Sequence, residues 1–233
     1  TNLVFPSLAR ANAADNHEES HALMHGALKS VSFVMLPIMA GFILLSEPVV
    51  MLIYQYGKFD AASTAITSTA LTFYSMGMIG FSYAEVLNKS FFAMQDSKTP
   101  MVTALISIAV NIALSYYFST VLGIGGLALA SALASTLNAA LNFILMNRRI
   151  KGIFGRQDGL DILKIVISVL IMSAVVFLTY RLPSPLFADH FIGRVLTLGI
   201  PVLAGAVVYF LLCYLLRVTE MHIMVDTFIK RKR

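Results

Sequence analysis

The sequence predicts an all-α fold, a polytopic bundle of helices that crosses a membrane several times. Of its 233 residues 58% are apolar and only 12% are charged, and the mean hydropathy is +0.80. These values lie far outside the range of soluble domains. The apolar residues form long runs, and the basic residues behind the net charge of +5 sit in short stretches between them. That pattern is typical of orientation signals, and we expect no nucleic-acid partner.

Residues 1–30 predict the end of a truncated helix followed by a cytoplasmic amphipathic segment. Residues 1–10 are apolar, and no Met or signal sequence opens the chain, so we expect this helix to begin in a longer protein. Asp15 and Glu18 have the spacing of a capping box, which predicts a new helix from about Asn16.

The histidines and the single cysteine favour neither a metal centre nor an enzyme. His17, His21 and His25 recur every four residues on one helical face, a spacing that suits a metal ion. A solvated interfacial face is favoured, because no cysteine or apolar shell accompanies them. Cys213 is the only cysteine, which excludes an intrachain disulfide. Since no nucleophile elbow or phosphate loop occurs, we expect no catalytic site, no metal and no cofactor.

Four membrane spans are expected over residues 31–147. In the first span Pro37 and Gly41 predict a kink, which a membrane helix tolerates when a neighbour satisfies the freed carbonyl. The GIGG stretch at residues 123–126 is long enough only for a tight reversal, so the last two spans form an antiparallel hairpin. The expected spans are Val31–Tyr54, Ala65–Ala93, Pro100–Leu122 and Leu127–Met146.

A polar elbow separates the second span from the third within residues 85–100, EVLNKSFFAMQDSKTP. Asp96 belongs to this turn. Thr99 before Pro100 matches an N-cap followed by proline at the first helical position, so a new helix is predicted to start there.

Polar side chains within the apolar spans are candidates for a substrate cavity, because such groups are costly in a bilayer unless they face a partner or water. Glu85 and Lys89 stand four residues apart in the favourable order for an ion pair, which would either seat the helix or face the cavity. Ser75 and Ser82 share their face. Two further stripes would either pack helices together or line a shared wet cavity. They are Thr103, Ser107, Asn111 and Ser115 in one span and Ser131, Ser135, Asn138 and Asn142 in the next.

Two more spans follow a basic connector. Residues 148–159 are expected along the membrane surface, residues 160–217 hold the two spans, and residues 218–233 form a basic tail. The two spans are Ile162–Tyr180 and Val195–Leu216. Fourteen Lys and Arg residues fall on one side of the six spans and three on the other. By the positive-inside rule, the elbow and the C-terminus are cytoplasmic.

Several stretches resemble one known family in the same order. They are LVFPSLAR at 3–10, LPIMAGFILLSEPVVMLIYQYGKFD at 36–60, VLNKSFFAMQDSKTP at 86–100, VNIALS at 110–115 and GIGGLALASALASTLNAALN at 123–142, followed by RR. The elbow stretch is the most specific of these. Over residues 1–150 the chain is therefore similar to the MurJ (MviN) lipid II flippases of the multidrug/oligosaccharidyl-lipid/polysaccharide (MOP) exporter superfamily. The last two spans resemble the family by position and character only.

This resemblance implies a MATE-like C-terminal lobe plus two extra helices, with the missing N-terminal lobe as the partner of this half. It implies transport of lipid II, the undecaprenyl-linked peptidoglycan precursor, by alternating access across the bacterial cytoplasmic membrane. The final two helices would form a groove for the lipid tail. The residues expected to line the substrate cavity are Ser82, Glu85, Asn88, Lys89 and Asn138.

Two departures from the family pattern bear on these residues. Glu85 stands where many members carry a basic residue, and Lys89 stands where many carry arginine. Asn111 and Ser131 match positions through which some members bind sodium, but Ser115 replaces the acid one turn after Asn111. Coupling to sodium or to the membrane potential is therefore a hypothesis.

Two alternative functions remain open at this point. The same fold would serve an oligosaccharide-lipid exporter or a drug antiporter. A non-transporting membrane scaffold would instead use Arg148, Arg149 and the C-terminal KRKR to bind anionic membrane lipids or a cytoplasmic partner.

Overall fold

The computed structural model describes residues 4–14, 16–150, 153, 156–181 and 191–230. The described part of the chain is helical. Its helices are α1 (Val4–Ala13), α2 (His17–Tyr54), α3 (Ala61–Met76), α4 (Met78–Ala93), α5 (Lys98–Leu122), α6 (Ile124–Arg149), α7 (Arg156–Arg181), α8 (Phe191–Leu215) and α9 (Thr219–Lys230). Helices α2, α5, α6, α7 and α8 each contain a segment long and apolar enough to cross a membrane. The prediction of a polytopic helical membrane protein is confirmed.

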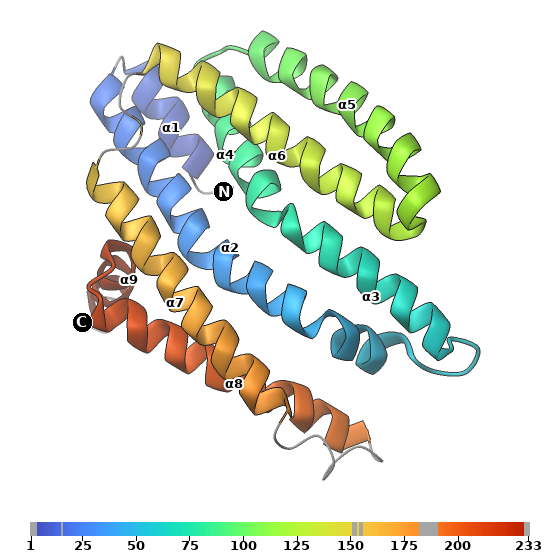
Figure 1. The fold of residues 1–233 in the computed structure, drawn as a ribbon. Coiled ribbons are helices and arrows are strands. Elements are labelled where there is room, and N and C mark those ends of the chain that lie inside the picture. The colour runs from blue at the N-terminus through green and yellow to red at the C-terminus, as the bar shows by residue number, and fades with distance from the viewer. Residues whose placement is uncertain (1–3, 15, 151–152, 154–155, 182–190, 231–233) are drawn as a thin grey trace.

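Helix α2 runs through the middle of the molecule and separates two groups of helices (Figure 1). On one side it packs on α3 and α4, and on the other it packs on α7 and α8. The α5–α6 hairpin packs on α3 and α4 through α6, which confirms the antiparallel pair predicted from the glycine-rich turn. Gly123 in that turn has a positive φ of 58°, a conformation that glycine adopts without strain.

The span predicted over residues 65–93 is not one unbroken helix, because the structure divides it into α3 and α4 at Gly77. Gly77 has φ −86° and ψ −7° and ends one helix while beginning the next. A Cβ atom at Gly77 would lie 2.6 Å from Cα of Ala132, and one at Gly80 would lie 2.8 Å from the backbone of Thr136. The glycines therefore let the junction touch the backbone of α6.

The kink predicted at Pro37 and Gly41 lies elsewhere in α2. Leu45 is the residue with a non-helical backbone, at φ −111° and ψ 17°. It stands three residues before Pro48, whose ring crowds the preceding turn and whose nitrogen cannot donate a hydrogen bond. The bend therefore belongs to the second proline of the helix rather than to the first.

The start of α2 is shifted by one residue from the predicted capping box. Asn16 is the N-cap, and its Oδ1 accepts a hydrogen bond from the backbone nitrogen of Glu19 at 3.2 Å. Its Nδ2 also donates to Oε2 of Glu19 at 3.0 Å. The predicted pair used Asp15, which lies outside the described residues. An asparagine serves both directions, because its amide donates and accepts.

The C-terminal segment contains a helix that the prediction of a basic tail did not include. Arg217, with φ 53°, forms the corner between α8 and α9. The second part of the predicted connector is already helical, since α7 begins at Arg156. Residues 151–152, 154–155 and 182–190 of the two connecting segments lie outside the described residues.

Candidate functional site

Asn142 is the centre of an amide network that joins α4, α5 and α6. Its side chain is 0% exposed. Its Nδ2 donates to Oδ1 of Asn88 at 2.8 Å and to Oδ1 of Asn138 at 3.1 Å, and its Oδ1 accepts from the hydroxyl of Thr103 at 2.8 Å. Both amide hydrogens and the carbonyl oxygen are thus used. A satisfied polar group of this kind holds neighbouring membrane helices in one register.

The polar stripes on α5 and α6 divide between two environments. Thr103, Ser107 and Ser135 are buried, and each hydroxyl donates to a carbonyl oxygen of its own helix. Asn88 and Asn138 are only half-buried, so both have a surface beyond the network. The buried members of the stripes therefore serve packing, and the half-buried members are the ones that remain candidates for a cavity.

Glu85 and Lys89 form the intrahelical ion pair predicted from their spacing. Oε1 of Glu85 and Nζ of Lys89 are 2.7 Å apart, and the glutamate is the more exposed partner. Ser82 lies one turn earlier on α4 and is half-buried. Glu85, Lys89 and Asn88 come together on the last two turns of α4, before the elbow. The described hydrogen bonds do not bring Ser82 into this group.

The three residues expected at an ion site meet only in part. Nδ2 of Asn111 donates to Oγ of Ser131 at 3.3 Å, which joins α5 to α6. Ser131 in turn donates to the carbonyl oxygen of Leu127 at 3.1 Å. Ser115, one turn later on α5, is half-buried, and no described hydrogen bond links it to this pair.

The elbow is built by Asp96 rather than by the predicted Thr99 cap. Oδ1 of Asp96 accepts from the backbone nitrogens of Lys98 and Thr99, at 3.0 Å each, and Oδ2 accepts from the hydroxyl of Thr99. Helix α5 begins at Lys98, so Pro100 is its third residue and not its first. An aspartate before the helix satisfies two of the free N–H groups at once.

Arg149 at the end of α6 pairs with the same carboxylate and thereby ties the elbow to α6. The hydrogen bonds from Thr99, together with the charge of Arg149, lower the pKa of Asp96 to about 2. The guanidinium also lies over the ring of Phe91, 5.5 Å from its centroid. Beside it a hollow of about 1010 Å³ with both polar and apolar lining residues opens between α1, α2 and the elbow, with Asn12 and Gln95 among them.

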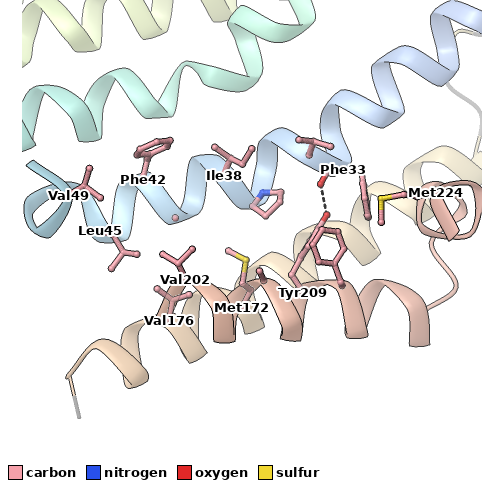
Figure 2. Close-up of a pocket in the computed structure, with 16 residues that line it drawn as sticks. Phe33, Ile38, Phe42, Leu45, Val49, Met172, Val176, Val202, Tyr209 and Met224 are labelled. Carbon is pink, nitrogen blue, oxygen red and sulfur yellow. Dashed lines mark hydrogen bonds between the residues drawn. The ribbon is translucent and has the colours of Figure 1, made fainter. Parts of the chain in front are cut away.

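An apolar groove of about 380 Å³ lies between α2, α7 and α8 (Figure 2). Figure 2 shows Leu45 on the side of α2 toward Val202 and Val176, with Met172 and Tyr209 on that same side. The lining residues are Phe33, Val34, Pro37, Ile38, Gly41, Phe42, Leu45, Val49, Met172, Val176, Val202, Gly205, Ala206, Tyr209, Phe210 and Met224. Tyr209 carries the single side-chain polar group other than sulfur in this lining.

The hydroxyl of Tyr209 is occupied by the backbone of α2. It donates to the carbonyl oxygen of Phe33 at 2.6 Å, as the dashed line in Figure 2 shows. That carbonyl lacks its helical donor, because the residue four positions later is Pro37. A neighbouring helix thus satisfies the carbonyl freed by proline, as the sequence predicted, and α2 continues through Pro37 with a helical backbone. The groove consequently presents an almost entirely apolar wall.

A buried charge cluster lies beyond one end of the groove, and sequence reasoning missed it. Nζ of Lys29 in α2 is 2.9 Å from Oδ2 of Asp161, 3.2 Å from Oδ1 of Asp158 and 3.1 Å from Oε1 of Glu220. These carboxylates belong to α7 and α9. The sequence counted Lys29 only as an orientation charge. The sequence did contain a signal for this cluster. Asp158 and Glu220 each lie in the first turn of a later helix, and buried carboxylates there need a cation to neutralise them.

One histidine of α2, His25, joins this cluster. Nε2 of His25 is 2.9 Å from Oδ1 of Asp158. The rings of His21 and His25 are parallel, with centroids 6.3 Å apart. The side chain of His17 lies outside the described residues. Within the described part of the chain, no three His, Cys, Asp or Glu side chains have the arrangement of a metal site.

Comparison with known proteins agrees with this architecture. The family model described as Lipid II flippase MurJ matches residues 1–197. The probable lipid II flippase MurJ of Rhizobium meliloti (strain 1021) is 32% identical over 216 residues, which cover 91% of this chain and 40% of that protein. The corresponding protein of Rhizobium tropici is 29% identical over 234 residues, covering 99% of this chain and 44% of the relative.

A solved structure of the same family has the same fold. It is the lipid II flippase MurJ in an inward closed conformation, with a TM-score of 0.74 and 27% sequence identity. The similarity covers 91% of this chain and 42% of that one. The chain thus spans about two fifths of the length of the relatives it matches. Neither an exporter of other cargo nor a scaffold is favoured by these matches, and the chain belongs to the lipid II flippase MurJ family.

Proposed function

We propose that this chain forms the C-terminal part of a lipid II flippase of the bacterial cytoplasmic membrane. The observation that carries the proposal is the apolar groove between α2, α7 and α8, in a chain that belongs to a family of lipid II flippases. In this proposal the groove holds the isoprenoid chain of the substrate. The transported headgroup lies in a cavity between this lobe and the remainder of the protein.

The dimensions of the groove suit a long apolar chain. Its lining on α2 runs from Phe33 to Val49, which corresponds to roughly 24 Å along a helix. The hydrocarbon core of a bilayer is about 30 Å thick. The satisfied hydroxyl of Tyr209 leaves the wall without a donor for a sugar or a phosphate. An isoprenoid chain is therefore a better occupant than a polar headgroup.

We propose that the headgroup cavity is lined from this half by the polar end of α4 and the half-buried face of α6. The residues are Ser82, Glu85, Asn88, Lys89 and Asn138. Lys89 supplies the positive charge that a diphosphate needs, and Glu85 beside it neutralises that charge when no ligand is present. The amide network behind Asn88 and Asn138 supports this surface. The missing N-terminal lobe would supply the opposite wall.

The proposed orientation places the elbow and the C-terminus in the cytoplasm. Lys and Arg residues are concentrated on that side of the spans. Transport would proceed by alternating access, with the headgroup entering from the cytoplasmic side, where the elbow lies. Membrane lipids would contact the exposed apolar faces of α5, α7 and α8.

We also propose that transport is coupled to sodium or to the membrane potential, through residues of α5 and α6. Nδ2 of Asn111 donates to Oγ of Ser131, and this bond does not use the amide oxygen of Asn111. Oxygen ligands of this type suit a hard cation, but Ser115 brings no charge. Lipid II export by the full-length protein should therefore be compared in sodium and in choline buffers. An Asn111→Leu variant should lose whatever sodium dependence the parent shows.

Complementation tests the proposed function directly. The full-length protein that contains this chain should support growth of bacteria depleted of their own lipid II flippase, and lipid II should reach the outer leaflet. Lys89→Ala should abolish or strongly reduce both. Growth failure with a well-expressed parent would contradict the function. Full activity of Lys89→Ala together with Glu85→Gln would remove the cavity assignment and leave the family unaffected.

A groove-blocking variant separates the tail site from the headgroup site. A Cβ at Gly41 meets no atom within 4 Å, so Gly41→Phe should fill the groove without disturbing the helix. We expect export to fall at least about tenfold, with an unchanged thermal transition. Gly26→Phe is the matched control, since Gly26 lies on the same helix, outside the groove, and is equally open. Equal activity of the two variants would contradict a role for the groove.

A further inference from the structure

Helix α9 lies across one end of the apolar groove. Met224 of α9 lines the groove beside Phe33 and Tyr209 (Figure 2). The corner that brings α9 there is tight, since the backbone nitrogen of Val218 donates to the carbonyl oxygen of Cys213 at 2.9 Å. Val218 itself is fully buried. The first turns of α9 therefore form the end wall of the groove.

Polar contacts hold α9 in this position. The hydroxyl of Thr219 donates to Oδ2 of Asp161 in α7 at 2.9 Å. Oε1 of Glu220 pairs with Nζ of Lys29 in α2 at 3.1 Å. Lys29 of α2 thus pairs with α7, which lines the groove along its length, and with α9, which closes its end. It is a positioning residue, because it sets α7 and α9 against α2 without touching the groove itself.

The contacts within the cluster make Glu220 its most easily released member. Lys29, Lys164 and the imidazole of His25 face the three carboxylates of Asp158, Asp161 and Glu220. Oε2 of Glu220 is buried and has no hydrogen-bond partner among the described residues. Asp161, by contrast, receives bonds from both lysines. When Glu220 leaves, Lys29 still pairs with Asp158 and Asp161, so the open arrangement leaves no buried lysine without a carboxylate.

We infer that α9 is a latch that closes this end of the groove, with the contact between Glu220 and Lys29 as its catch. In the closed state Met224 ends the groove. In the open state α9 withdraws from α2 and α7, and the groove continues to the protein surface. The role of the latch rests on the proposed function: an isoprenoid chain longer than the groove passes through the opened end while its headgroup is moved.

Cys213 is a native reporter for this opening. It is 0% exposed and packs in the same apolar cluster as Val218, against which Met221 and Met224 of α9 lie. It is also the only cysteine of the chain. Withdrawal of α9 uncovers this cluster, so the rate of alkylation at Cys213 measures the population of the open latch.

The experiment uses the purified full-length protein in detergent, N-ethylmaleimide as the probe, and peptide mass mapping of Cys213. Glu220→Gln keeps the shape of the side chain and removes its charge. We expect alkylation at least about tenfold faster than in the parent, which corresponds to about 1.4 kcal/mol of opening free energy. Glu47→Gln is the matched control. It makes the same chemical change at an exposed position of α2, outside the cluster, and the rate should stay within about twofold.

Three results would overturn the latch. They are rapid alkylation of the parent, an unchanged rate in Glu220→Gln with normal elution and helix content, and equal acceleration in Glu47→Gln. Lys29→Met should also accelerate alkylation. If Lys29→Met does not fold, Glu220→Gln alone tests the latch. The readout needs no transport. Failed complementation together with the expected alkylation pattern would contradict the proposed function alone. Successful complementation without the expected alkylation pattern would contradict the latch alone.

Discussion

The two sides of α2 are held together by opposite means. On the α3–α6 side, helices meet at small residues, and a buried amide bonds to three polar partners. On the α7–α8 side, apolar residues line an open groove and the charges gather at one end. Where α3 and α4 meet α6 the backbones approach closely, whereas the α7–α8 side keeps a chain-sized apolar space open.

This difference is visible in the glycines of the two regions. A Cβ at Gly77 would meet the backbone of α6, but a Cβ at Gly41 would meet nothing within 4 Å. Glycine thus permits close approach at Gly77, and also at Gly205 where α8 meets Val176 of α7, whereas at Gly41 it leaves room for a ligand. The comparison suggests a rigid lobe beside an adaptable groove, and the variants below test it from the largest expected effect to the smallest.

Gly77→Ala should cause the largest loss of stability. The added Cβ would lie 2.6 Å from Cα of Ala132, and a backbone atom can move away only if α6 shifts. Overpacking of this kind costs about 1 to 3 kcal/mol. Thermal unfolding of the full-length protein in detergent measures the effect. Gly41→Ala is the control and should unfold at the parental temperature or above it. Equal transitions for both variants would contradict the tight packing of the α3–α6 side.

Asn142→Leu should have the next largest effect. The substitution removes hydrogen bonds to Asn88 and Thr103 on two other helices and leaves their polar groups without this partner. We expect a loss of about 1 to 2 kcal/mol. Asn147→Leu, at an exposed position at the end of α6, should be nearly neutral by the same unfolding assay. A stabilised Asn142→Leu protein would show that the network is dispensable for packing.

Tyr209→Phe should cost less, because one hydrogen bond is lost and the ring stays in place. The carbonyl oxygen of Phe33 would then have neither a helical donor nor the tyrosine hydroxyl. We expect a loss of about 0.5 to 1.5 kcal/mol. Tyr116→Phe, on the exposed face of α5, is the matched control. A double variant with Pro37→Ala should recover the loss, since alanine restores the missing N–H group.

Asp96→Asn should have the smallest effect, and one that depends on pH. The pKa of Asp96 in the folded protein is about 2, below the ordinary value of about 3.9. Its contribution to stability is therefore complete above about pH 4 and is lost as the pH falls toward 2. Unfolding of the parent and of Asp96→Asn should differ at pH 5 and converge near pH 2. A constant difference across this range would contradict the ionised elbow.

Local patterns in the sequence predicted much of the fold, because they act over a few residues. Runs of apolar residues predicted the membrane helices, the glycine turn at 123–126 predicted the hairpin, and the four-residue spacing predicted the Glu85–Lys89 pair. The break at Gly77 was missed because its cause, contact with α6, is tertiary. Likewise the bend of α2 belongs to Pro48, and two prolines in one helix look alike in sequence.

The candidate sites likewise divide into features that local sequence patterns predicted and features that depend on tertiary contacts. The stripe on α6 was visible in the sequence, but only the fold distinguishes buried Asn142 from half-buried Asn138. The Lys29 cluster joins residues 132 and 191 positions apart, and no local spacing relates them. Such long-range ion pairs depend on how the helices dock, which the order of apolar runs does not specify.

Photocrosslinking of lipid II from the groove tests the central claim most directly. Val202 lines the groove, and its neighbour Leu203 is 68% exposed and lies outside it. Benzoylphenylalanine placed at residue 202 of the full-length protein should capture radiolabelled lipid II through its isoprenoid chain. The same group at residue 203 should capture at most about a tenth as much. Equal capture at the two positions, or capture at residue 203 alone, would contradict a tail-binding groove between α2, α7 and α8.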